Sequence, residues 1–475
     1  MTTSTPQNVV FILTDTFNKH HIGAYGCDFA RTPNLDRLAA DGLRFDRAYP
    51  GSPLCTPARG CIFTGLHPAS NGCTFNDATP YRQVPILGEV LRDADIDIAY
   101  TGKWHIEGSG LYLGDGRADG GFPEKWWYDG RNYADDIGPE REAIWRRFSR
   151  GTWEEILERA FSEEDCWATR LADRAVEFIE QPHDKPFFLC VSIDEPHGPF
   201  MSPREYLEQT SADDFEIRPN VHDDLQNKPN WHKFLAKGHR NVEEDLRFFW
   251  RYYSACCTYT DAQIGRIIDA VHRNHGDDTL IVFTSDHGEQ MGCHGCWGKG
   301  YMMYEESAGV PLIVSGPGVP EGASNPHPVS HLELFPTFLD ALGLPGDPRL
   351  HGHSLSPVFE NPEKRLREHV MIGHERFGND GRPGIDLRCD EPISPNKKEF
   401  FPIRCMVDDR YKLVINLFDK DELYDHTEDP YEMHNRIDDP TLHPVRDRLH
   451  QAMLEEMYRT RDPLRGSCWN DRYDA

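Results

Sequence analysis

The sequence of 475 residues lacks any long hydrophobic run: nowhere do about 18 or more apolar residues follow one another, as a membrane-spanning helix requires. The apolar stretch at residues 9–13 follows no basic segment and precedes no cleavage site, so it does not resemble a signal peptide. We therefore interpret residues 9–13 as a core strand, expect no membrane as a partner, and predict a cytoplasmic protein.

Positive charge is also scarce, because 79 acidic side chains outnumber 51 lysines and arginines and give a net charge of −28. A surface with this charge repels nucleic acids, so none is expected as a partner. The surface also repels anionic substrates. Any site for an anion therefore has to concentrate basic residues locally.

The thirteen cysteines form no disulfide framework, since their number is odd and their spacing is irregular. In a chain without a signal peptide we expect them to be mostly reduced and buried.

Short β-rich segments alternate with helical patterns along the first 315 residues, and several of these segments precede a polar residue. This alternation predicts an α/β fold in which helices sandwich a large mixed, mainly parallel sheet. Sites in such sheets form at the carboxyl ends of the strands. The strands are expected at residues 9–13, 96–100, 187–193, 280–283 and 310–314, and the polar residues after the first four are Asp15, Lys103, Asp194 and Asp286.

The pattern changes after about residue 360, where strands at 370–372 and 411–415 and a helix at 443–458 are expected. We predict a catalytic domain at 1–365 and a smaller C-terminal α+β subdomain at 366–475 that completes the pocket. Two segments either line the pocket or lie on the solvated surface: the loop 376–400 with Arg376, Arg382, Asp386 and Arg388, and His351-Gly-His353.

The segment Cys55-Thr-Pro-Ala-Arg59 carries the strongest local signal. A helix is expected from about residue 57 to residue 64, with Gly65 ending it. Cys55 then lies at a helix N-terminus, which favours anions, and Arg59 lies one turn later on the same face. The alternative is a buried structural cysteine beside an exposed arginine. A tyrosine phosphatase is excluded because it requires a longer spacing between cysteine and arginine.

Cys-x-Pro-x-Arg followed by Thr64-Gly65 resembles the signature of the sulfatase family, in which the cysteine is converted to formylglycine. Five further segments in family order are similar to the second signature, to two metal-binding stretches and to two other active-site positions, and a sixth is similar to the C-terminal subdomain of the family. The chain most resembles bacterial cytosolic sulfatases and phosphonate monoester hydrolases of the alkaline-phosphatase superfamily. These segments are Asp15, Tyr100-Thr-Gly-Lys103-Trp-His105, Glu195-Pro-His197, Asp286-His287-Gly-Glu, Gly298-Lys299-Gly300 and Asp421-Glu-Leu-Tyr-Asp425.

The resemblance implies hydrolysis of a small or carbohydrate sulfate ester by a formylglycine diol made from Cys55 by a formylglycine-generating enzyme or another maturase. One hydroxyl attacks sulfur, and the other loses a proton when sulfate is expelled. A divalent metal, Ca²⁺ or Mn²⁺, is implied as well. Its implied ligands are Asp15, Cys55, Asp286 and His287. Whether the enzyme forms a homo-oligomer is left open.

The remaining functional residues follow from the same resemblance. Arg59 and Lys103 are expected to orient the diol, and Lys299 and His197 to contact sulfate or the leaving oxygen. His105 is expected to accept the proton of the diol. Asn76 is a candidate for a sulfate contact.

One departure from the family pattern concerns Thr16, which stands where many sulfatases have a second acidic residue. Phosphonate monoester hydrolases also lack that acid, so a phosphonate monoester or phosphodiester substrate is one alternative. A non-catalytic binding protein with unconverted Cys55 is the other.

Overall fold

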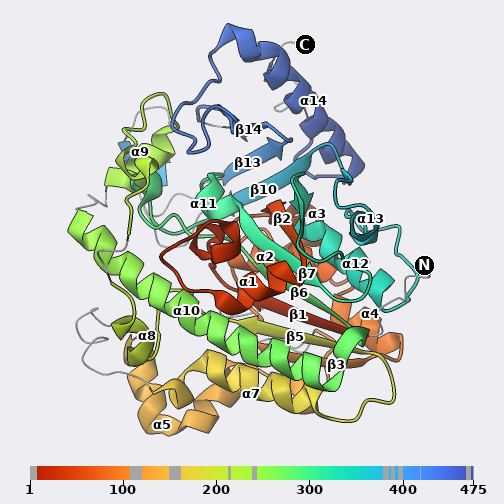
Figure 1. Ribbon diagram of the computed structural model, residues 1–475. Helices are drawn as coiled ribbons and strands as arrows, with labels where there is room; N and C mark the ends of the chain where they lie inside the picture. The colour runs from red at the N-terminus through yellow and green to blue at the C-terminus, as the bar shows by residue number, and fades with distance from the viewer. Residues whose placement is uncertain are drawn as a thin grey trace.

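The computed structural model describes residues 8–106, 120–148, 162–211, 215–237, 243–377, 384–386, 391–393, 400–417, 419–466 and 472–473. Within these ranges the chain forms a large sheet between two layers of helices, with a smaller sheet beside it (Figure 1). The expected α/β class is therefore confirmed.

The large sheet has nine strands in the order β4-β3-β5-β1-β6-β7-β2-β8, with β9 paired to β2. Strands β3, β5, β1 and β6 are parallel neighbours, whereas β7 is antiparallel to both β6 and β2. The strands are β1 (Asn8–Thr14), β2 (Gly42–Tyr49), β3 (Asp97–Gly102), β4 (Trp127–Tyr128), β5 (Phe187–Ile193), β6 (Thr279–Ser285), β7 (Val310–Ser315), β8 (Ala323–Asn325) and β9 (Val329–Ser330).

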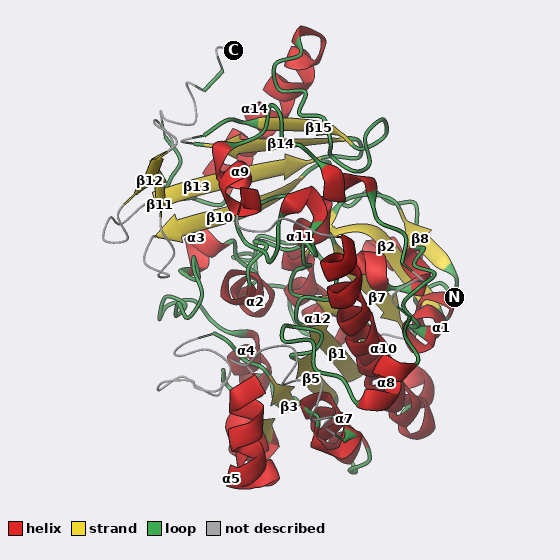
Figure 2. Ribbon diagram, turned by 90° about the vertical axis from the view of Figure 1, so that its left-hand side faces the viewer, coloured by secondary structure: helices red, strands yellow, loops and turns green. Residues whose placement is uncertain are grey.

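Two hydrophobic cores lie on opposite faces of this sheet, because successive side chains of a strand point to opposite faces. Val10 and Ile12 of β1 pack with α1, α7 and α10, whereas Val9 and Phe11 pack with α2, α4 and α12. Figure 2 shows these two helical layers on either side of the strands. The helices of the large unit are α1 (Pro33–Ala40), α2 (Cys55–Thr64), α3 (Pro68–Asn71), α4 (Leu87–Asp93), α5 (Gly130–Phe148), α7 (Trp167–Ile179), α8 (Arg204–Glu208), α9 (Asn230–Lys237), α10 (Glu243–Asn274), α11 (Glu305–Ala308), α12 (Leu334–Ala341) and α13 (Ser356–Glu360).

The C-terminal part forms an antiparallel sheet in the order β10-β13-β14-β15, covered by α14. Leu449, Met453 and Met457 of α14 pack on Leu413 and Ile415 of the sheet. These elements are β10 (Val370–Phe377), β13 (Phe400–Val407), β14 (Tyr411–Asn416), β15 (Glu422–Asp425) and α14 (His443–Arg459), and a separate pair is formed by β11 (Gly384–Asp386) and β12 (Glu391–Ile393).

All the strands expected from the sequence occur, but the sequence interpretation missed β13 and also β2, in which polar residues interrupt the buried ones. The segment 376–400, expected to be a loop, contains the paired strands β11 and β12. The helical pattern expected around residues 264–271 is only the last part of α10, which has 32 residues. None of the described helices is both long and apolar enough to cross a lipid bilayer.

A buried ionic network joins the two sheets. Lys412 of β14 places its Nζ 2.8 Å from Glu305 Oε1 and 2.7 Å from Glu432 Oε1. Lys19 contacts the other oxygen of Glu305 at 2.8 Å. Glu305, His426 and Glu432 have the spacing of a metal site. The two ammonium groups already supply the positive charge that a metal would bring.

This network lowers the pKa of the Glu432 carboxyl group. Burial alone raises its pKa, but Lys412 and His426 lower the pKa to about 2, below the ordinary value of 4.5. A carboxylate whose pKa falls on folding stabilises the native state above its unfolded pKa. The contribution of Glu432 is therefore complete above about pH 4.5 and is lost as the pH falls toward 2.

We predict that Lys412→Met lowers the free energy of unfolding by about 3–5 kcal/mol, because two buried carboxylates lose their shared cation. Lys420→Met is the matched control, since Lys420 pairs with Asp438 at the surface and should contribute less than about 1 kcal/mol. Denaturant unfolding of both variants near neutral pH measures the difference. Equal losses would contradict the stabilising role of the network.

Candidate active site

Four neighbouring strands each deliver a charged side chain to the same edge of the large sheet. Lys103 follows β3, Asp194 follows β5, Asp15 follows β1 and Asp286 follows β6. Because these strands are parallel, their carboxyl ends meet. The expectation that polar residues gather at this edge is confirmed.

Helix α2 brings Cys55 to this edge by its first turn. The helix starts at Cys55, two residues earlier than expected, and Gly65 ends it in the left-handed conformation with φ 67°. The backbone N–H of Thr56 donates to Asn76 Oδ1 at 3.2 Å, and the Thr56 hydroxyl donates to the carbonyl of His105 at 2.6 Å. Asn76 and His105 thereby hold the start of the helix.

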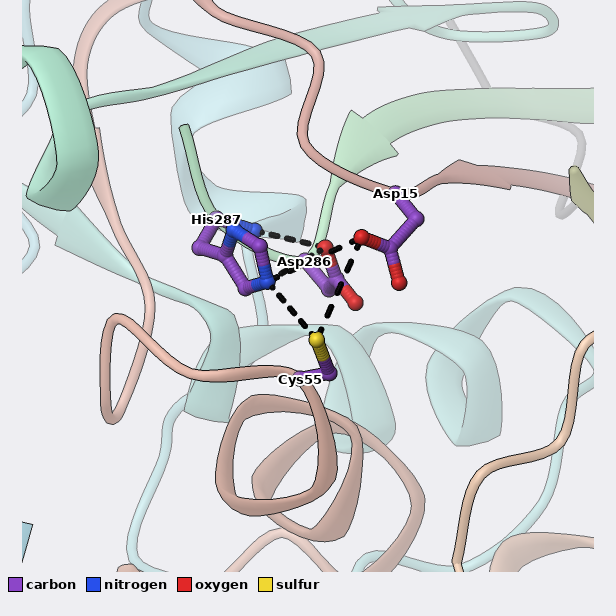
Figure 3. Close-up of side chains that lie close together, drawn as sticks. All are labelled: Asp15, Cys55, Asp286 and His287. Carbon is purple, nitrogen blue, oxygen red and sulfur yellow. Dashed lines mark hydrogen bonds and ion pairs between the residues drawn. The ribbon is translucent and has the colours of Figure 1, made fainter. Parts of the chain in front are cut away.

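Four potential metal ligands converge at this point, namely Asp15, Cys55, Asp286 and His287 (Figure 3). Their ligand atoms lie within 4.8 Å of one another, and all four residues are buried. His287 Nε2 is 3.1 Å from Cys55 Sγ, 3.7 Å from Asp15 Oδ1 and 3.5 Å from Asp286 Oδ1. The structure thus brings together the four residues that were predicted from the sequence as metal ligands.

The guanidinium of Arg59 lies behind this cluster and is completely buried. Its Nε donates to Asp286 Oδ2 at 2.8 Å and one terminal nitrogen donates to Asp15 Oδ2 at 3.2 Å. The other terminal nitrogen donates to the Lys103 carbonyl and to the Ser192 hydroxyl. Arg59 therefore connects α2 with the ends of all four strands.

Two lysines add positive charge beside the cluster. Lys103 Nζ lies 2.6 Å from Asp15 Oδ2 and 2.8 Å from Asp194 Oδ1. Lys299 donates at 3.1 Å to the hydroxyl of Thr16, which itself donates to Asp15 Oδ1 at 2.6 Å. In this arrangement the hydroxyl of Thr16 supports the Asp15 carboxylate and connects it to Lys299.

The two expected histidines have different partners. His105 Nε2 is 3.4 Å from Asp77 Oδ1, and its side chain is 10% exposed. His197 is partly buried, and its Nδ1 lies 2.8 Å from the carbonyl oxygen of Gly198. His197 also lowers the pKa of Asp15, as do Lys103 and Lys299, although burial alone would raise it.

The cations reverse the effect of burial on Cys55. Burial and Asp15 each raise the pKa of a thiol in this position, but Lys299, His287 and Lys103 together hold the pKa of Cys55 well below its usual value. By contrast, burial and the nearby Asp15 raise the pKa of Asp286 to about 6, against the influence of His287 and Arg59. The site thus stabilises negative charge at residue 55, while the carboxylates of Asp15 and Asp286 repel each other.

In the two segments that were assigned either to the pocket or to the surface, one residue lies away from the site. His351 is at the far end of α2, where its backbone N–H donates to the Gly65 carbonyl. Arg382 and Arg388, and the side chains of Arg376 and Asp386, lie outside the described residues. The sequence interpretation gave no role to Asp194, Ser192 or Asp77. Only Asp194 had a signal, its position at the end of a strand.

The sulfatase family profile matches residues 7–344. The chain belongs to the sulfatase family. Sulfatase YidJ of Escherichia coli strain K12, described as uncharacterized, is 37% identical over 470 residues, which cover 98% of this chain and 90% of that protein. The choline-sulfatase of Rhizobium meliloti strain 1021 is 28% identical over 93% of this chain and 84% of its own length.

A solved structure has a similar fold. The phosphonate monoester hydrolase of Agrobacterium radiobacter superposes with a TM-score of 0.77 and 26% identity, covering 96% of each chain. The sulfatase described here therefore has an alkaline-phosphatase-like fold, and it is a sulfuric ester hydrolase like its relatives.

Proposed function

We propose that this sulfatase hydrolyses a small or carbohydrate sulfate ester with a formylglycine made from Cys55. The observation that carries the proposal is the convergence of Cys55, two carboxylates and His287 at the buried start of α2. Hydrated formylglycine would supply two hydroxyls on one carbon, so that one can attack sulfur and the other can lose a proton. The name of the choline-sulfatase relative supports a small alcohol as leaving group.

A divalent metal fits the donor set. Asp15 and Asp286 offer the oxygen ligands that Ca²⁺ and Mn²⁺ prefer, His287 offers a nitrogen, and the Cys55 sulfur stands in for the formylglycine oxygens. Burial, and after it the nearby Asp15 carboxylate, raises the pKa of Asp286, and a cation held between the two carboxylates would favour their charged forms. When bound, the metal would increase the acidity of a hydroxyl and neutralise charge on the sulfate oxygens.

Lys103 and Arg59 would orient the diol of residue 55, and Lys299 would contact the sulfate group. Lys103 and Arg59 hold the Asp15 carboxylate, and Arg59 also donates to the carbonyl of Lys103. Lys299 would balance charge on a non-bridging sulfate oxygen, since its Nζ lies beside Thr16. Asn76 would act indirectly, by fixing the first turn of α2. Together Arg59, Lys103 and Lys299 concentrate positive charge in a protein whose net charge is −28.

The two histidines would move protons. The Nδ1–H of His197 can donate to the Gly198 carbonyl, so a protonated ring keeps Nε2–H for the leaving oxygen. His105 lies next to Cys55 and would remove the proton from the second hydroxyl of residue 55.

A maturase is the expected partner of the unfolded chain. Cys55 is 1% exposed and every residue of α2 is buried. An enzyme that converts the cysteine would therefore have to reach this segment before α2 packs.

Phosphonate monoester or phosphodiester hydrolysis is the second candidate function. Thr16 favours it because it brings no second negative charge to the metal site, and the similarity to a phosphonate monoester hydrolase is in line with it.

We predict that the matured enzyme hydrolyses an aryl sulfate with a kcat/KM at least about tenfold above that for the matching aryl phosphodiester. Cys55→Ala should abolish both reactions. Cys61→Ala, which removes another buried thiol of the same helix, should remain active. Faster turnover of the phosphodiester would favour the second candidate. Activity of Cys55→Ala would refute the role of residue 55.

We also predict that Asp286→Asn weakens Ca²⁺ and Mn²⁺ binding by at least about tenfold, because the site loses one of its two negative ligands. Asp261→Asn is a control for changing a buried carboxylate, since Asp261 caps the backbone of Asn34 and Leu35 instead. Metal content after dialysis and calorimetric titration of the demetallated proteins measure the effect. Unchanged metal affinity in Asp286→Asn would contradict the ligand set.

A further inference from the structure

The protein contains a cavity of about 520 Å³ whose described lining residues include none of those assigned to the active site. Residues of the segment 18–29, which follows β1, line this cavity together with residues 216–219, Trp250 of α10 and, from the C-terminal part, Pro430 and Tyr431. Cavities of this size that form where structural units meet are typical binding sites for small molecules.

His21 is the lining residue that most clearly requires a partner. It is 5% exposed, and neither of its ring nitrogens has a hydrogen-bond partner among the described residues. T-shaped contacts hold the ring in place, with the centroids of the Phe29 and Tyr253 rings 5.2 Å and 4.7 Å away. A buried polar group without a hydrogen bond destabilises the folded state, so we expect a partner from outside the chain.

The protonation of His21 determines what that partner has to offer. Burial and the Arg218 guanidinium lower the pKa of His21 to about 3, so the ring is neutral near pH 7. A neutral imidazole has one N–H and one lone pair. Its partner therefore has to accept a hydrogen bond at one nitrogen and donate one at the other. Ammonium groups only donate and sulfate or carboxylate groups only accept, whereas hydroxyl groups do both.

His20 sets the same requirement next to His21. Its Nε2 is buried and has no hydrogen-bond partner among the described residues. Burial, followed by Arg218 and Lys19, holds the pKa of His20 well below its ordinary value. Two neighbouring neutral imidazoles favour a ligand with several hydroxyl groups.

The charges of the lining disfavour an anionic ligand. Arg218 is the one permanent cation among the described lining residues, and its guanidinium lies 3.1 Å from Glu306 Oε1. Asp28 and Glu216, which are both exposed, add two further carboxylates. The lining is therefore net negative and repels sulfate and phosphate.

Aromatic rings supply the apolar part of the lining. Phe29 is partly buried, and Tyr431 is 37% exposed with the Arg218 guanidinium 5.4 Å from its ring centroid. A sugar carries hydroxyl groups around its edge and C–H groups on its faces, and such apolar faces pack on aromatic side chains. A neutral sugar therefore matches the hydrogen-bonding groups, the charge and the aromatic rings of the cavity.

We propose that this cavity is a second, non-catalytic site that binds a neutral sugar. Hydroxyl groups of the sugar donate to one nitrogen of His21 and accept the N–H of the other. A further hydroxyl accepts from the buried Nε–H of Arg218, which also has no partner among the described residues. The sugar is either a free molecule or an unsulfated unit of a longer carbohydrate sulfate. Its binding goes beyond the function proposed for residue 55 and requires no formylglycine.

Ligand-observed NMR titration of the full chain with unconverted Cys55 tests the binding. The probes are D-glucose, D-galactose and N-acetyl-D-glucosamine, with tetramethylammonium and sodium sulfate for comparison. We expect at least one sugar to bind, and His21→Phe, which keeps an aromatic ring between Phe29 and Tyr253, to weaken its binding by about tenfold. Tyr431→Ser, a change at an exposed position, should weaken the same binding. Binding of the two ions should not respond to either change.

His275→Phe is the matched control. His275 directly follows α10, whereas the cavity residue Trp250 lies near the start of that helix, and it also packs on an aromatic ring, that of Phe187, at 4.9 Å. This variant should bind the sugar as the wild type does. Three results would overturn the proposal: no binding of any of the three sugars, equal binding by wild type and His21→Phe, or binding that is lost in Lys299→Met and not in His21→Phe.

Kinetics of the matured enzyme separate the two sources of the sugar. If the sugar is part of the substrate, His21→Phe should raise KM about tenfold for a sulfated disaccharide and leave KM for an aryl sulfate unchanged. If it is a free molecule, both KM values should stay the same in His21→Phe. An equal rise in both KM values would show that His21 acts through the active site and would overturn the proposal. Inactivity of the wild type toward every sulfate ester would refute the proposed function and leave the binding result as it stands.

Discussion

The site depends on the hydrogen bonds that the buried guanidinium group of Arg59 donates. It donates to Asp15 and Asp286 at the ends of two strands, and to the Lys103 carbonyl at the end of a third. Because Arg59 lies one turn after Cys55, these bonds also fix the start of α2 against the sheet. Arginine suits this position, since its rigid fork of donors satisfies several acceptors at once.

Charge is distributed unevenly in this protein. The surface is strongly acidic, whereas Arg59, Lys103 and Lys299 gather at one edge of the sheet. Burial lowers the pKa of both lysines, but Asp15 and Asp194 raise the pKa of Lys103 above its ordinary value, and Cys55 and Asp15 do the same for Lys299. A sulfate group entering this edge would meet fixed positive charge in a region that excludes water, where electrostatic interactions are strong.

Much of this site was predictable because the residues that carry it follow simple local rules. Asp15 and Asp286 end hydrophobic strands, and Cys55 with Arg59 occupies one helical turn. The contact of Asp77 with His105 was not predictable, because both residues have left-handed backbone and the Thr56 hydroxyl bonds to the backbone of each. Strand β2 was not predicted because Arg44, Asp46 and Arg47 interrupt its hydrophobic pattern. The other residues of the strand are buried.

The central claim is that residue 55 acts as formylglycine. Mass spectrometry of the tryptic peptide 48–59 from an active preparation tests it most directly. The account predicts a peptide lighter than the encoded one by the exchange of H₂S for one oxygen, in proportion to the specific activity. Ordinary oxidation of the thiol would instead make the peptide heavier. A fully active enzyme in which residue 55 is an unmodified cysteine would contradict the account.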